Sequence, residues 1–235
     1  MEQVIHAHSE VKPAMQHLAR AIERLKRRLL FLSTQVEECV RQAVRAVETR
    51  DSELAAQVIA NDSDIDILEV DVEEECLKIL ALHQPVAIDL RFIIAALKMN
   101  NDLERIGDLA VNIAQRAESL AGKTPANVPF DLPAMAAKAQ AMLKKSLDAV
   151  VGMDTVLARE VLEADDEVDK ENRYVHKQVK MAIQKDPALL DELIQLLIVA
   201  RHIERIADLA TNIAEDAIYM VDGDIVRHNI SVDNP

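Results

Sequence analysis

The sequence contains little of what β-sheet proteins are built from. Of its 235 residues, four are glycine, none is tryptophan and only 2% are aromatic, although 50% are hydrophobic. β-Sandwiches and barrels need many tight turns and are enriched in aromatic residues, so the composition argues against both. Alanine, leucine, isoleucine, valine and acidic residues dominate instead, which is typical of an α-helical protein.

Positive charge is also scarce. Lys and Arg number 27 against 41 Asp and Glu, which gives a formal net charge of −14. Because a polyanion repels phosphate backbones, we expect no nucleic acid partner and favour cations or basic protein surfaces. The longest apolar runs, at 92–97 and 196–200, fall far short of the roughly 20 residues that span a bilayer. Residues 1–10 do not resemble a secretory signal, so we expect a cytoplasmic protein.

Cysteine is nearly absent. Cys39 and Cys76 are too few for a disulfide framework and do not form a CxxC pair. Both fall on apolar helical stripes, so we predict buried thiols with no chemical role.

Prolines and turn residues divide the chain into helix-forming segments, because a proline removes a backbone donor and clashes with the preceding helical turn. The expected helices cover roughly residues 14–48, 52–83, 86–121, 132–152, 155–184 and 187–221, with a linker at 122–131. We therefore predict an all-α fold of two elongated antiparallel three-helix bundles, which form two domains at 14–121 and 132–228.

An internal repeat supports this division. Residues 103–117 align with 203–217 at an offset of 100, and ten of these fifteen residues are identical. The second helix of each half aligns at an offset of 103, which sets Asp62 and Asp66 against Asp165 and Asp169. The sequence therefore encodes one three-helix unit twice.

The repeat includes polar residues that packing does not require. On the third and sixth helices, apolar residues with alternating spacings of three and four form a predicted buried seam: Phe92, Ala96, Met99, Leu103, Ile106, Ala110, Ile113, Ala117 and Leu120, and Leu196, Val199, Ile203, Ile206, Ala210, Ile213, Ala217 and Met220. Glu104, Asp108 and Asn112 advance by four on the side turned away from this seam, as do Glu204, Asp208 and Asn212. Repetition of outward-facing residues indicates a function.

The second helix adds further negative charge, with eight acidic residues and no Lys or Arg between Asp62 and Glu75. Like charges one helical turn apart destabilise a helix, and bound cations would offset the repulsion. If this helix lies beside the polar side of the third, carboxylates from both converge on metal ions. Oxygen ligands suit Mg, Mn, Ca or iron better than structural zinc. The predicted metal ligands are Asp62, Asp66, Glu104 and Asp108 in the first half and Asp165, Asp169, Glu204 and Asp208 in the second.

Other interpretations of these carboxylates remain. They can be a solvated helix face, or parts of surface ion pairs such as Glu104 with its neighbour Arg105. The chain can then be a purely structural helical adaptor. A di-metal carboxylate enzyme is the least favoured, because such bundles direct Glu-x-x-His motifs inward and none occurs at the repeated positions. His202 is expected at the surface.

Two motifs carry a resemblance to a known family. The sequences Leu-Glu-Arg-Ile-Gly-Asp at 103–108 and Ile-Glu-Arg-Ile-Ala-Asp at 203–208 are each preceded by a helix with a DxxxD, at 62–66 and 165–169. Together with the closing segment 217–228, they resemble the PhoU family over nearly the whole chain.

This resemblance implies a function and partners. Members of the family are phosphate transport accessory proteins that bind metal clusters through E/D-xxx-D motifs. A non-enzymatic cytoplasmic regulator is implied, which acts with the ATP-binding subunit of the phosphate ABC transporter and a sensor histidine kinase to keep phosphate-starvation genes off. The resemblance also implies a homodimer, membrane association only through partners, and divalent or trivalent ions (Mg, Mn, Fe or Zn). The family motif corresponds to Glu104, Asp108, Glu204 and Asp208, with Asp62, Asp66, Asp165 and Asp169 as second-helix counterparts.

Overall fold

The structure is a computed structural model that describes residues 2–123 and 127–223, with side chains from residue 16 onwards. Within these residues it contains no strand, which confirms the predicted all-α fold. The helices are α1 (Glu2–Thr49), α2 (Ser52–Ala60), α3 (Asp62–His83), α4 (Ala87–Leu120), α5 (Leu132–Gly152), α6 (Thr155–Lys185) and α7 (Leu190–Asp222), with a 3₁₀ turn, η1 (Pro187–Leu189), before α7.

Two boundaries differ from the prediction. The single helix expected over 52–83 is broken at Asn61, where the amide N–H of Asp64 donates to the Asn61 carbonyl at 3.1 Å in a tighter turn. Asn and Asp compete with the helical backbone for hydrogen bonds, and they cluster at this break. At the N-terminus, α1 begins at Glu2 and includes Pro13. Residues 224–228 of the predicted second domain lie outside the described residues.

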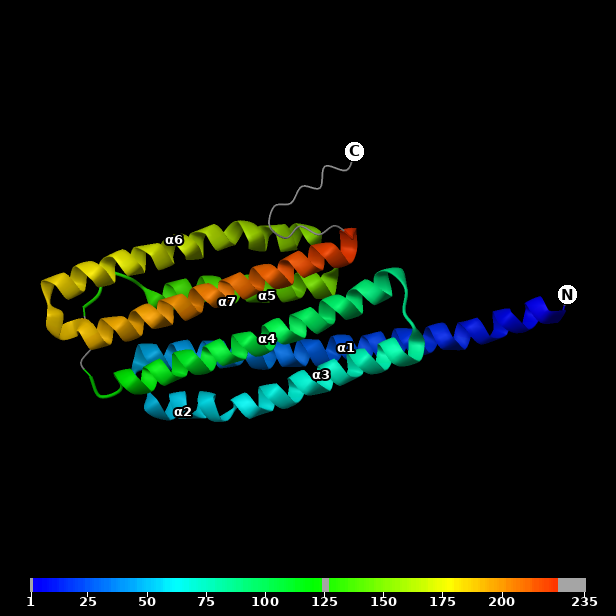
Figure 1. Ribbon diagram of the computed structural model, residues 1–235, viewed down its shortest axis with the longest axis horizontal. Coiled ribbons are helices and arrows are strands. Elements are labelled where there is room, and N and C mark those ends of the chain that lie inside the picture. Colours follow the sequence, from blue (N-terminus) through cyan, green and yellow to red (C-terminus); the bar gives the residue numbers. More distant parts are fainter. Residues whose placement is uncertain (1, 124–126, 224–235) are drawn as a thin grey trace.

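The helices run along one axis in two sets of three (Figure 1), with α2 and α3 together forming one member of the first set. The first set packs around α4 and the second around α7, and α4 and α7 lie side by side. These are the two repeat-related three-helix bundles that the sequence predicts. No helix of the described part is long and apolar enough to cross a membrane.

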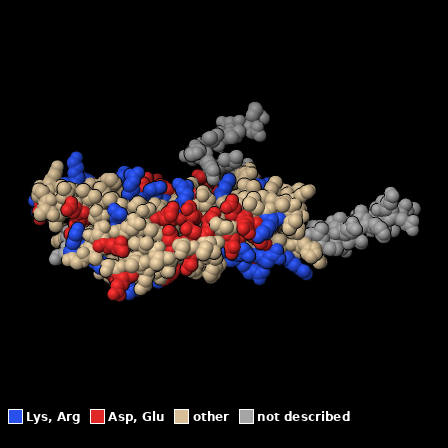
Figure 2. Space-filling view, turned by 60° about the horizontal axis from the view of Figure 1, so that its bottom comes forward, with Lys and Arg blue, Asp and Glu red and all other residues tan. Residues whose placement is uncertain are grey.

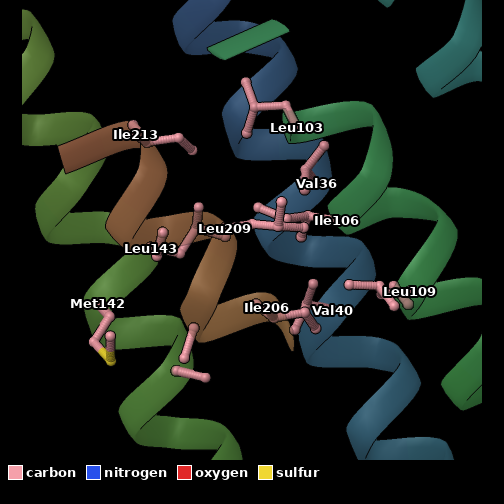
Figure 3. Packing of buried hydrophobic residues seen from close by; sticks show 14 of the residues in the cluster. Val36, Val40, Leu103, Ile106, Leu109, Met142, Leu143, Ile206, Leu209 and Ile213 are labelled. Atoms are coloured by element: carbon pink, nitrogen blue, oxygen red, sulfur yellow. The ribbon is translucent and has the colours of Figure 1, made fainter. Parts of the chain in front are cut away.

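A single hydrophobic core runs through both bundles. Figure 3 shows Val36 and Val40 of α1 next to Ile106 of α4, with Leu209 of α7 reaching toward the same layer. Every residue of the two predicted seams is buried, which confirms the seam pattern on α4 and α7. Because the core is shared, the division into domains at 14–121 and 132–228 stays a prediction.

Both cysteines are buried, as predicted. Cys39 is 6% exposed and Cys76 is fully enclosed. Burial raises the pKa of each thiol to about 12, so neither is a thiolate at neutral pH.

Candidate functional site

The packing of α3 on α4 brings the predicted ligands of the first half together. Gly107 of α4 faces Ile65 of α3, and a Cβ built on Gly107 would lie 3.4 Å from two carbons of Ile65. The absence of a side chain at Gly107 therefore allows a close approach of the two helices. Asp62 lies three residues before Ile65 and Asp66 directly follows it, while Asp108 follows Gly107, so this contact aligns the acidic edges of the two helices.

The electrostatics of the first group reflect this proximity. Burial, and then the charges of Asp66 and Asp108, raise the pKa of Asp62. The pKa of Glu104 is raised by burial and by Asp108, Glu69 and Asp66, although Arg105 opposes the shift. Glu69 of α3 is thus a fifth member, and we call Asp62, Asp66, Glu69, Glu104 and Asp108 the first carboxylate cluster. Figure 2 shows Asp and Glu side chains gathered on this face of the molecule.

The second half repeats the arrangement on α6 and α7. Burial is the largest cause that raises the pKa of Asp165 to about 6, followed by the charges of Asp208, Asp169 and Glu204. Asp208 and Asp169 also raise the pKa of Glu204, again after burial. We call Asp165, Asp169, Glu204 and Asp208 the second carboxylate cluster. The eight predicted ligands therefore fall into two groups of four, one in each half.

The outward orientation predicted for the repeated polar residues is confirmed. Asp108 and Asp208 are exposed, and Glu104 and Glu204 are half-buried, whereas the seam residues beside them are enclosed. Each carboxylate cluster thus lies at the surface, where two helices of one bundle pack against each other.

Two buried asparagines border the clusters, and the sequence reasoning missed both. Asn100 is 1% exposed, and its Nδ2 donates to Glu69 Oε1 at 2.9 Å and to the Glu69 carbonyl at 3.0 Å. Asn172 is 8% exposed and hydrogen-bonds the Glu204 side chain. Within the described residues, the Oδ1 atom of each has no hydrogen-bond partner. Asn100 lies one helical turn before Glu104 on the same side of α4, and that spacing could have revealed it.

The donor set suits hard cations. Carboxylate and amide oxygens are the ligands that Mg²⁺, Mn²⁺ and Ca²⁺ prefer, and the unpartnered Oδ1 atoms of Asn100 and Asn172 are donors of that kind. In the arrangement that the described residues have, no three His, Cys, Asp or Glu side chains are gathered closely enough to hold a metal ion. Neighbouring carboxylates repel one another, so a cation would have to draw them together. Metal binding by the eight residues stays a prediction.

His202 differs from its expected surface position. The residue is half-buried on α7, and its Nδ1 has no hydrogen-bond partner among the described residues. Burial, and then the charges of Arg205, Arg116 and Arg201, lower the pKa of His202. A predominantly neutral imidazole at pH 7 follows.

Comparison with known proteins identifies related sequences. A family model described as "PhoU domain" matches residues 29–117 and 132–217, one match in each half. The chain is 39% identical over 211 residues to a phosphate-specific transport system accessory protein PhoU homolog of Aquifex aeolicus, covering 90% of this chain and 96% of that protein. A protein of the same description from Pseudomonas aeruginosa is 37% identical over 215 residues, covering 91% of this chain and 88% of that protein.

Two solved structures share the fold. The crystal structure of PhoU from Pseudomonas aeruginosa superposes with a TM-score of 0.83 at 36% identity, covering 88% of this chain and 99% of that one. The phosphate transport system regulatory protein PhoU from Streptococcus pneumoniae gives a TM-score of 0.80 at 28% identity, with 89% and 99% covered. The similarity thus extends over both bundles and both carboxylate clusters.

Proposed function

The chain belongs to the PhoU domain family, and from this we propose that it is an accessory protein of phosphate transport that regulates phosphate uptake and the phosphate-starvation response. The observation that carries the proposal is that the family match falls once in each half and that relatives described as accessory proteins of phosphate-specific transport align over about nine-tenths of the chain. The chain acts in the cytoplasm as a regulator and not as an enzyme.

The two carboxylate clusters are the proposed working surface. In the absence of cations each presents several repelling charges close together, as the raised pKa values of Asp62, Glu104 and Asp165 indicate. Divalent or trivalent cations held there would supply positive charge that neutralises the cluster and changes what the surface attracts. The carboxylates would hold the ions, and Asn100 and Asn172 would add neutral oxygen donors.

The proposed partners are the ATP-binding subunit of the phosphate ABC transporter and a sensor histidine kinase, and the protein is proposed to be a homodimer. Through these partners it would act at the membrane without inserting into it. High phosphate would favour the complex, and through it repression of phosphate-starvation genes.

A co-purification experiment tests this function. The tagged full-length chain is expressed in cells that contain its own transporter, and the transporter subunit recovered with it is quantified at low and high phosphate. We expect recovery at high phosphate, together with repression of a phosphate-starvation reporter that is lost when the gene is deleted. If the reporter is indifferent to the deletion and no transporter subunit is recovered, the chain is a structural adaptor.

Elemental analysis of the same preparation tests the metal sites. The test variant removes four cluster charges: Glu104→Gln, Asp108→Asn, Glu204→Gln and Asp208→Asn. A matched control removes four charges from exposed carboxylates outside the clusters: Glu53→Gln, Glu118→Gln, Glu163→Gln and Asp191→Asn. We expect the wild type and the control to retain metal after purification without chelator and the test variant to lose it. Equal metal contents in all three would rule out the carboxylate clusters as the sites.

A further inference from the structure

The two carboxylate clusters differ in how much of their charge the protein itself neutralises. In the second cluster, Arg173 of α6 forms an ion pair with Asp169, with Nη1 2.9 Å from Oδ2. The charge of Arg201 acts on Glu204, and that of Arg205 on Asp208. Three arginines therefore surround four carboxylates.

The first cluster lacks most of these cations. At the offsets of the internal repeat, Val70 stands where the second half has Arg173, and Asn101 stands where it has Arg201. Arg105, the counterpart of Arg205, remains. None of the five carboxylates of the first cluster takes part in an ion pair among the described residues.

The first cluster also has a carboxylate where the second half has an amide. Glu69 occupies the position of Asn172, and its charge acts on Glu104. In the second half Asp166, at the position of Ser63, likewise acts on Asp165, so each half has five neighbouring carboxylates. One arginine lies near the five of the first half and three lie near the five of the second, so an incoming cation meets fewer competing charges in the first half. Glu69 also supplies a charged oxygen ligand where Asn172 supplies a neutral one.

A buried asparagine borders each cluster, and its unpartnered amide oxygen could serve as a ligand to a cation. The Asn100 amide contacts Glu69 at 2.9 Å and that of Asn172 contacts Glu204, yet both Oδ1 atoms are without a partner in the described part of the chain. A buried amide oxygen without a partner is costly. Because amide O and N exchange places on a half-turn of the side chain, Oδ1 can face a cation in the cluster once the carboxylate binds that cation instead of the amide N–H.

We propose that the first carboxylate cluster binds cations more tightly than the second, so that the two sites fill at different cation concentrations. The difference in affinity comes from two pairs of equivalent positions, where the first half has Glu69 and Val70 and the second has Asn172 and Arg173. This inference rests on the proposed metal-binding function. Arg173 acts as a built-in counter-ion that an incoming cation must displace from Asp169. The protein would thereby respond to cation concentration in two steps.

The test measures Mn²⁺ binding at each site separately, in chelator-stripped full-length protein, from the electron paramagnetic resonance signal of free Mn²⁺. Glu204→Gln with Asp208→Asn leaves only the first site, and Glu104→Gln with Asp108→Asn leaves only the second. We expect the first site to bind about tenfold more tightly, and the ratio to shrink as salt is raised.

Exchanging the exposed residues then tests the cause. Val70→Arg in the first-site protein is expected to weaken Mn²⁺ binding about fivefold, and Arg173→Val in the second-site protein to strengthen it about fivefold. The matched control for Val70→Arg is Leu77→Arg, at an exposed position two turns further along α3. The matched control for Arg173→Val is Arg173→Lys, which keeps the charge. Each control should change the Mn²⁺ affinity less than twofold.

The outcomes separate this inference from the proposed function. Equal affinities at the two sites, or tighter binding at the second, overturn the inference and leave metal binding intact. Val70→Arg and Arg173→Val variants that bind like their parents overturn the assigned cause. If neither single-site protein binds Mn²⁺, the metal-binding function fails together with the inference.

Discussion

The turns that join the first and second helices of each half have the same backbone but different side-chain roles. Arg50 and Met153 occupy equivalent positions, and both adopt left-handed conformations, with φ of 54° and 51°. The following aspartates, Asp51 and Asp154, cap the next helix by accepting from two backbone N–H groups each. Their own N–H groups return to carbonyls five residues back at 3.0 and 2.9 Å.

The side chains at these equivalent turns then diverge. Arg50 reaches from the first half into the second, where it pairs with the buried Glu192, and it also donates to the Leu120 carbonyl at 3.0 Å. Met153 is 39% exposed and makes no such connection. The repeat therefore preserves backbone geometry and capping, while side chains outside the core acquire separate functions in each half.

The strongest test of this contrast is Arg50→Gly. Glycine suits the left-handed backbone, but the substitution removes the ion pair with the buried Glu192 that joins the halves, and also the hydrogen bond to Leu120 within the first half. We expect the free energy of unfolding to fall by about 2–4 kcal/mol, as measured by urea denaturation. A stability equal to that of the wild type would show that Arg50 does not connect the halves energetically.

The contact between α3 and α4 is the next site to test. Ile65 and Gly107 in the first half correspond to Val168 and Ala207 in the second. The first half thus combines the larger aliphatic side chain with glycine, and the second combines the smaller aliphatic side chain with alanine. Gly107→Val should overpack against Ile65 and lower the free energy of unfolding by about 2 kcal/mol. The double change Ile65→Val with Gly107→Ala copies the second half and should stay within about 1 kcal/mol of the wild type in the same denaturation experiment.

Charge repulsion in the clusters gives a pH-dependent prediction. The pKa of Asp165 in the folded protein is raised to about 6, so its ionised form destabilises the fold. In metal-free protein the Asp165→Asn variant should have the same free energy of unfolding as the wild type near pH 4. Its stability relative to the wild type should increase as pH rises toward 6 and above. After allowance for solvent screening the gain is about 1 kcal/mol at pH 7. Thermal melts in EDTA across this range measure it, and a gain that is constant with pH would contradict the assignment.

Met153→Gly is expected to have the smallest effect. Glycine adopts the left-handed conformation without the clash that Met153 incurs, and no buried ion pair is lost. We expect a gain of about 0.5–1 kcal/mol in the free energy of unfolding, opposite in sign to Arg50→Gly. Two changes with the same sign would contradict the different side-chain roles assigned to Arg50 and Met153.

Much of the fold could be predicted because it depends on local patterns. The seam residues from Phe92 to Leu120 were identifiable from their helical spacing. The break at Asn61 was missed because no proline or glycine marks it. The helix start at Glu2 differs from the prediction because Pro13 indicates a boundary, whereas α1 continues through it.

The candidate site was only partly predictable. The eight carboxylates follow from the repeat, whose outward-facing residues need no structure to be recognised. Asn100 and Asn172 were not predicted. Asn100 continues the four-residue spacing of Glu104 and Asp108, but its burial depends on how α3 packs against α4. Asn172 is an isolated buried polar residue and has no periodic signal. Glu69 was visible among the acidic residues of its helix, but its association with Glu104 depends on how α3 packs against α4.

The sequence by itself determined the helices, their buried faces, the repeat and the positions of the acidic residues. These properties depend on interactions within a few turns of one helix, which composition and spacing encode directly. Only the tertiary structure decided that α4 and α7 share one core, that Arg50 pairs with Glu192, and that Arg173 neutralises Asp169 while Val70 leaves its counterpart uncompensated. Such contacts depend on the rotation and approach of helices far apart in the chain, and these are settled by the packing of the whole core.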